Sequence, residues 1–159
     1  MYGMASIRSR IGENLEDRYL FKAKRKDNGE WVEGFYFCMT HTDGRHTHHF
    51  IIPLGADLSL GTPVEKIQVE VDQSTICQCT GLKDKNGRVI WENDIVAYWD
   101  SYSTESGLAE ADCIGKVVWD DETISFQVTN RLSAESYEVL GDECSVIGNV
   151  FDNPELLEE

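Results

Sequence analysis

Short runs of apolar residues, separated by polar turn sequences, repeat along most of the chain. Aromatic and β-branched residues are frequent at residues 19–25, 31–38 and 50–53, and residues 64–71 alternate between apolar and polar positions. Alternation with a period of two is typical of half-buried β-strands. The first half of the chain is therefore predicted to form short strands, with residues 54–66 as turns.

The second half continues this pattern. Further strands are predicted at residues 75–80, 89–91, 95–99, 113–119, 123–128 and 144–151. Asn28-Gly29 and Asn86-Gly87 each lie between two such runs, which is the strongest short-range signal of a β-hairpin. The polar residues 100–112 are predicted to form a mobile loop, and residues 133–140 are ambiguous.

Helix signals are scarce. Residues 14–17 could form one turn, and Asn153 and Pro154 suit the N-cap and first position of a short C-terminal helix that Leu156 and Leu157 would anchor. A chain of 159 residues with many short strands fits one small β-barrel or sandwich. We expect an N-terminal arm at residues 1–17 and a single β domain at residues 18–159.

The net charge of the chain disfavours two classes of function. The chain has 14 Lys and Arg against 29 Asp and Glu, a net charge of −15, and residues 101–159 hold 2 basic and 14 acidic residues. Direct binding to duplex nucleic acid or to an anionic membrane is disfavoured, because both need a basic footprint. Residues 1–50 have 8 basic and 7 acidic residues and could meet the acidic last third of a second copy.

The number and positions of the cysteines indicate the cellular compartment of the protein. The chain has five cysteines, which is an odd number, and no apolar run follows Met1 as it would in a secretory signal. Both observations indicate reduced thiols in a cytoplasm. Cys38, Cys113 and Cys144 lie in or beside apolar runs, as core thiols do. Cys77 and Cys79 would share one strand face and could form a zinc or redox pair, but two core residues are the simpler interpretation.

The histidines are the sharpest candidate for chemistry. His41, His46, His48 and His49 fall within nine residues, and on an extended strand His46 and His48 would share one face. Such a spacing can chelate zinc or nickel, with His49, Asp43 or Cys38 as further ligands. The alternative is a polar loop with exposed histidines. Because the paired signature of a structural zinc site is missing, we expect no metal.

Catalytic patterns are missing from the sequence. Asp120-Asp121-Glu122 and Asp94 offer carboxylates, but the triplet lies between strand-like runs and is typical of a solvated turn. There is no Gly-x-Ser-x-Gly elbow, phosphate-binding loop or dinucleotide fingerprint. We expect no catalytic residues, no cofactor and no enzymatic activity. Core packing and barrel lining are predicted for most of the four tryptophans, which are Trp31, Trp91, Trp99 and Trp119.

Three segments resemble one protein family. Residues 79–96 read CTGLKDKNGRVIWENDIV, residues 146–157 read VIGNVFDNPELL, and residues 19–34 contain a weaker motif. Together they resemble the YopX family of phage and prophage proteins. The resemblance implies a β-rich domain whose C-terminal half is an SH3-like barrel, and an unassigned activity.

One position departs from the family motif. The family has Gly where this chain has Asn93, so we expect a positive φ there, which Asn tolerates better than other non-glycine residues. Gly81, Gly87 and Gly148 are predicted to shape turns, and Asp84 to cap its own turn. A motif of turn and core residues specifies a fold and names no reaction.

Three functions are compatible with the sequence. The first is a non-enzymatic phage or prophage accessory protein in the cytoplasm of the bacterial host, a β-barrel module that binds a protein partner or itself. The second is an acidic mimic of nucleic acid that inhibits a basic host protein. The third is a metal-dependent protein that uses the loop from His41 to His49.

Overall fold

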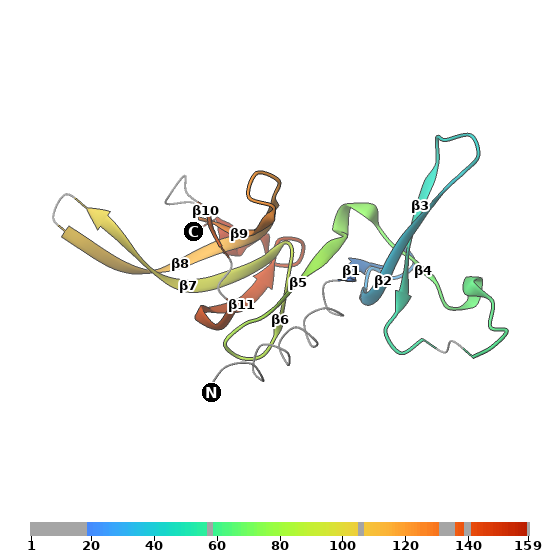
Figure 1. Ribbon diagram of the computed structural model, residues 1–159, viewed down its shortest axis with the longest axis horizontal. Coiled ribbons are helices and arrows are strands. Elements are labelled where there is room, and N and C mark those ends of the chain that lie inside the picture. Colours follow the sequence, from blue (N-terminus) through green and yellow to red (C-terminus); the bar gives the residue numbers. More distant parts are fainter. Residues whose placement is uncertain (1–18, 57–58, 105–106, 131–135, 139–140, 159) are drawn as a thin grey trace, which may run out of the picture. The chain divides into compact units, whose positions relative to one another are not determined.

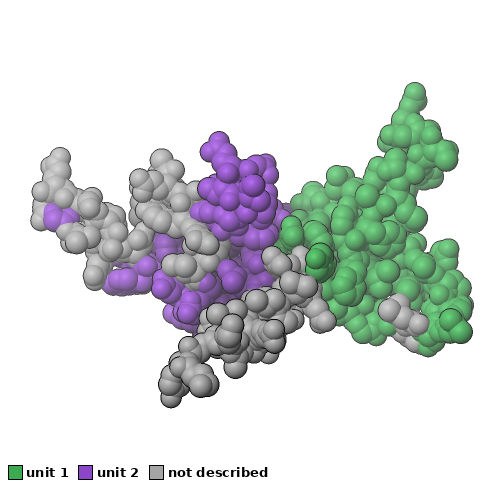
Figure 2. Space-filling view, in the orientation of Figure 1, with its two compact units in different colours: residues 1–79 green, residues 80–159 purple. Residues whose placement is uncertain are grey.

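A computed structural model describes residues 19–56, 59–104, 107–130, 136–138 and 141–158. The predicted arm at 1–17 and the helical turn at 14–17 lie outside these residues. The chain is mainly β, as predicted (Figure 1). It divides into two compact units, residues 1–79 and residues 80–159 (Figure 2), which are described separately below.

Strands account for most of the described elements. The strands are β1 (Leu20–Lys24), β2 (Trp31–Thr40), β3 (Thr47–Pro53), β4 (Val69–Glu70), β5 (Cys77–Lys83), β6 (Val89–Trp91), β7 (Asp94–Thr104), β8 (Gly107–Asp120), β9 (Ser125–Asn130), β10 (Ser136–Glu138) and β11 (Cys144–Asn149). The 3₁₀ helices are η1 (Val64–Lys66), η2 (Gln73–Thr75), η3 (Gly141–Glu143) and η4 (Pro154–Leu157). None of the helices described is long and apolar enough to cross a membrane.

The first unit is built on strands β1 to β4. They belong to a sheet of order β4-β3-β2-β1-β5-β6, in which β5 runs from the first unit into the second. Antiparallel pairing sets Ala23 opposite Val32 and Ile51 opposite Tyr36. Residues opposite each other share a face, so these side chains meet in a small core around the buried Ala23 and Ile51.

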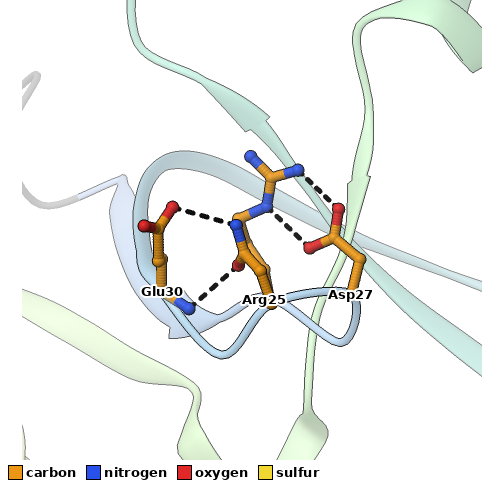
Figure 3. Close-up of polar contacts among 4 residues, drawn as sticks. Arg25, Asp27 and Glu30 are labelled. Atoms are coloured by element: carbon orange, nitrogen blue, oxygen red, sulfur yellow. Dashed lines mark hydrogen bonds and ion pairs between the residues drawn. The ribbon is translucent and has the colours of Figure 1, made fainter.

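The turn between β1 and β2 forms the predicted Asn-Gly hairpin. Gly29 has φ +75°, and its N–H donates to the carbonyl of Arg25 at 2.9 Å. The guanidinium of Arg25 holds the carboxylate of Asp27 through two hydrogen bonds of 2.9 and 2.6 Å (Figure 3). This contact lowers the pKa of Asp27 and raises that of Arg25. These contacts within the turn support the hairpin that the sequence predicts.

The second unit holds a five-stranded antiparallel sheet of order β10-β9-β8-β7-β11. One face of this sheet carries the core of the unit. The buried core residues are Ile90, Val96, Val117, Val128, Cys144 and Val146. β11 bulges between Val146 and Gly148, where its register with β7 shifts.

Asp84 organises the turn between β5 and β6. Its Oδ1 accepts the N–H groups of Asn86 and Arg88 at 2.8 and 2.9 Å, which confirms the predicted cap. Its Oδ2 accepts the N–H of Val146 in β11 at 3.0 Å. Burial opposes ionisation of this carboxylate, but the three backbone donors outweigh it and lower the pKa of Asp84. The turn is thereby bound to β11.

Two predicted elements are wrong. Residues 64–71 do not form one strand, because residues 64–66 form η1 and only Val69–Glu70 pairs with β3. Residues 100–104 and 107–112 are not a loop, because β7 and β8 stay paired from Asp100 opposite Ala111 to Thr104 opposite Gly107. Ser, Thr and Tyr are compatible with strands when a partner strand completes the hydrogen bonds, and polarity alone misled the prediction.

The structure also corrects some residue roles. Gly81 and Gly148 lie in β5 and β11 rather than in turns. A Cβ on Gly148 would lie 2.6 Å from Oδ1 of Asn153, so Gly is needed there for close approach. Asn153 makes no side-chain cap on η4, which is a single 3₁₀ turn. Its Oδ1 instead accepts the N–H of Asn149 at 3.4 Å.

In the part of the chain that the structure describes, two residues other than glycine have positive φ. Asn93 has φ +65° in the turn between β6 and β7, as predicted. Ile124 has φ +55° in the turn between β8 and β9, where its side chain is 75% exposed. A β-branched residue in this conformation is strained, because its Cβ crowds the carbonyl oxygen.

Candidate functional site

The histidine-rich segment forms the end of the β2–β3 hairpin and the start of β3. The ring centroid of His41 lies 6.0 Å from that of His46 and 5.3 Å from that of His48. The Nδ1 atoms of His46 and His48 contact the carboxylates of Asp43 and Glu70, at 3.2 and 2.9 Å. His46 and His48 are predicted to share one face of the strand. The rings of both lie close to the ring of His41, which agrees with this prediction.

His49 belongs to the opposite face of β3. It is 8% exposed, and its Nδ1 lies 2.7 Å from the hydroxyl of Tyr36. Burial, together with a hydrogen bond to Cys38, raises the pKa of this hydroxyl. Strand alternation thus separates His49 from the other candidate ligands, and it packs against the core of the first unit.

Metal ligation is not prearranged in this segment. Among the described residues no three His, Cys, Asp or Glu side chains are arranged to hold a metal ion. Cys38 is exposed and pairs with His49 across the strands, away from His46 and His48. Asp43 and Glu70 act as hydrogen-bond partners of histidine rings.

A pocket of about 470 Å³ lies beside this segment, within the first unit. It is lined by Lys26, Arg45, His46, Thr47, His48, His49 and Gln73. No carboxylate lines it, although the whole chain has twice as many acidic as basic residues. The sequence analysis found the histidines but missed Lys26 and Gln73, since only the fold brings them beside the hairpin.

The carboxylates that the sequence analysis considered for catalysis, Asp94 and residues 120–122, stabilise turns. Asp94 is 2% exposed, and its Oδ2 accepts the N–H of Trp91 at 2.9 Å. Asp120 accepts the N–H of Glu122 at 2.8 Å, and this bond lowers the pKa of Asp120. Asp121 accepts the indole N–H of Trp119. The interpretation of residues 120–122 as a turn is supported by these bonds.

The other cysteines are core residues. Cys77 and Cys79 are 0% and 1% exposed on β5, in agreement with the simpler interpretation of this pair. Cys113 and Cys144 are also buried, whereas Cys38 is exposed. The five cysteines all belong to the described residues, and no disulfide joins any of them.

The second unit exposes an apolar face that the sequence analysis did not predict. Trp99 is 59% and Ile114 is 39% exposed, and Ile114 pairs with Ala97, two residues before Trp99. They therefore lie on the same face of β7 and β8, opposite the face that carries Val96 and Tyr98. We call Ala97, Trp99 and Ile114 the outer apolar strip. The prediction that most of the four Trp pack in the core holds for Trp91, which is 5% exposed, and fails for Trp99 and Trp119, which are 59% and 42% exposed.

Comparison with known proteins gives a family and no activity. No curated protein matches the chain significantly. A crystal structure titled as protein EF1440 from Enterococcus faecalis is similar, with 25% sequence identity and a TM-score of 0.45, over 86% of this chain and 96% of that one. The profile of the family described as YopX protein matches residues 20–158, nearly the whole chain. The chain therefore belongs to the YopX family.

Proposed function

We propose that this chain is a non-enzymatic accessory protein of a phage or prophage, which acts as a protein-interaction module in the bacterial cytoplasm. Membership of the YopX family supports the phage or prophage context. The use of Asp84 and Asp94 as acceptors of backbone N–H groups supports a structural rather than a catalytic role for these carboxylates.

We further propose that the second unit is an SH3-like barrel. Its five-stranded antiparallel sheet and the hydrogen bond from β11 to the β5–β6 turn support this assignment. In such a barrel a partner would bind on the outer surface of the sheet, because the inner face is filled by the core.

The observation that carries the interaction function is the outer apolar strip. Trp99 and Ile114 are neighbours on one face, and both are more than a third exposed. Tryptophan is enriched among the residues that contribute most to binding at protein interfaces. Exposed apolar residues that lie together mark interaction sites more often than scattered ones do.

Charge defines the partner. Asp112 lies directly opposite Trp99 in the β7–β8 pair and is exposed. Residues 80–159 contain 5 Lys and Arg against 18 Asp and Glu. The strip is thus an apolar centre in an acidic unit, and its partner is a protein surface that combines apolar side chains with Lys or Arg.

The test compares two variants of the tagged protein. W99S/I114S removes the strip, and F35S removes a similarly exposed aromatic side chain from the first unit as the matched control. Proteins captured from host lysate at low salt are identified by mass spectrometry, and the affinity of each purified candidate is measured by calorimetry. We expect a basic partner that loses affinity at least about tenfold with W99S/I114S and binds F35S normally.

Other results would contradict this function. A partner that binds W99S/I114S as tightly as the native protein, or one that is lost only with F35S, places the interface elsewhere. Light scattering that shows self-association of the native protein, but not of W99S/I114S, replaces the foreign partner by a second copy of the chain.

An acidic mimic of nucleic acid is the second candidate, favoured by the 18 acidic residues of residues 80–159. A mimic occupies the nucleic-acid site of its target, so duplex DNA would displace the captured partner. An interaction through the outer apolar strip predicts a partner that DNA leaves in place.

A further inference from the structure

The pocket beside the β2–β3 hairpin has a chemistry unlike the rest of this acidic chain. We propose that it binds the phosphate group of a small phosphomonoester. The pocket belongs to the first unit, so this inference is independent of the outer apolar strip and of the proposed interaction function. Its volume of about 470 Å³ lies within the range of small-molecule sites and leaves room for an organic group beside the phosphate.

Arg45 supplies the principal charge. Its side chain is exposed at the hairpin end, and it makes no ion pair with a carboxylate within the part of the chain that the structure describes. Its backbone is held, because its N–H donates to Asp43 at 2.9 Å. An arginine fork binds phosphate oxygens through two parallel hydrogen bonds, which makes it the preferred partner of such groups.

Lys26 and His48 share one carboxylate. Oε1 of Glu70 lies 2.8 Å from Nζ of Lys26 and 2.9 Å from Nδ1 of His48. Both contacts, that of Lys26 first, lower the pKa of Glu70, so this carboxylate stays ionised and fixes the two side chains. One carboxylate that serves two donors leaves further N–H groups of Lys26 for a ligand.

The histidine rings are oriented in the same way. The Nδ1 atoms of His46 and His48 face Asp43 and Glu70, so the Nε2 atoms are the nitrogens left for a ligand. An imidazole whose Nδ1–H donates to a carboxylate has its ring position fixed. A neutral ring held in this way accepts at Nε2, so His46 and His48 donate to a phosphate only when protonated. The donors that the lining offers without this condition are the side chains of Lys26, Arg45 and Gln73.

The composition favours an anion over a metal cation. Lys26 and Arg45 repel a cation at close range, and the neighbouring carboxylates of Asp43 and Glu70 bond to lining side chains without lining the pocket themselves. It also favours a small phosphomonoester over a nucleic-acid backbone. A monoester presents a dianion to these few donors, whereas a polymer would meet the net charge of −15 of the whole chain.

The experiment titrates the ¹⁵N-labelled full chain with glycerol 3-phosphate and with inorganic phosphate, at constant ionic strength. Amide signals are followed by NMR and the affinity is measured from their shifts. Dimethyl phosphate, a monoanionic diester, serves as the ligand control. R45Q removes the proposed fork, and K66Q removes one positive charge from an exposed site of the same unit that does not line the pocket.

We expect saturable shifts in residues 45–48 and in Gln73 with both phosphates, and an affinity at least about fivefold lower in R45Q than in K66Q. Tighter binding of glycerol 3-phosphate than of inorganic phosphate identifies a phosphomonoester as the ligand, and the reverse order identifies the free ion. Equal shifts with dimethyl phosphate, an unchanged affinity in R45Q, or no saturation at millimolar concentrations would overturn the proposal.

Discussion

Oδ2 of Asp84 lies 3.0 Å from the backbone nitrogen of Val146, 62 positions further along the chain. Asp84 belongs to the first motif shared with the YopX family, and Val146 begins the closing motif. The two segments that resemble the family are therefore in contact, and their meeting point is a buried carboxylate that accepts backbone N–H groups. The role of Asp84 in the first motif is therefore a structural one.

Replacement of Asp84 by Asn should destabilise the protein by about 2–3 kcal/mol. The amide places an NH₂ group where a carboxylate oxygen now accepts, so a buried N–H loses its partner. Urea unfolding measures the change. D27N is the matched control, since its carboxylate is 62% exposed and serves only the first turn. A loss in D84N no greater than in D27N would contradict this account.

The same carboxylate predicts a dependence on pH. The pKa of Asp84 is lowered in the folded chain from its ordinary value of 3.8. Its contribution to stability is therefore fully present above about pH 3.8 and is lost as the pH falls through the lower folded value. Urea unfolding of the native chain and of D84N from pH 6 downward tests this. The difference between them should shrink below pH 3.8, and a constant difference would refute the linkage.

I124N should stabilise the protein by about 1 kcal/mol. Ile124 has φ +55° and is 75% exposed, so the substitution relieves backbone strain and gives up little burial. Thermal unfolding is the measurement. I147N, at a 40% exposed isoleucine of β11 without a positive φ, provides the control and should not gain stability.

A complementary prediction concerns Asn93, a residue type that tolerates a positive φ. Because its φ is +65°, N93G should change stability by less than about 0.5 kcal/mol, while N93V should cost about 1–2 kcal/mol. Denaturant unfolding of both variants compares them directly. Equal costs would show that the side chain of Asn93, and not its backbone conformation, is what the turn requires.

Chelators should leave stability unchanged. His46 and His48 contact carboxylates through Nδ1, and His49 contacts Tyr36, so their positions are accounted for without a metal. Thermal unfolding after EDTA treatment, and again with added zinc, is the check. A midpoint that falls with EDTA, or that zinc raises in the native chain but not in H46A/H48A, would revive the metal-dependent function.

The sequence could predict those features whose cause is local. The first hairpin follows from Asn28-Gly29, and the strand at residues 89–91 follows from a turn that Asp84 caps. The positive φ of Asn93 was also predictable, since few residues tolerate it.

Features that depend on a distant partner were missed. The alternation in residues 64–71 predicts one strand, but pairing is found only at Val69, Glu70 and Val71. The paired stretch from Asp100 to Thr104 gives no apolar pattern and is held by β8 alone. Trp99 lies in an all-apolar run, which cannot tell which face is buried. Lys26 and Gln73 reach the pocket only through the fold.

The turn at Asp84 also protects the edge of β11. The N–H of Val146 donates to Asp84, and the carbonyl of Cys144 accepts the N–H of Lys85 at 3.0 Å. An unoccupied strand edge is a template on which another chain can add a strand and begin to aggregate. At these two residues the template is already filled by the protein's own turn, so a second chain cannot extend the sheet there.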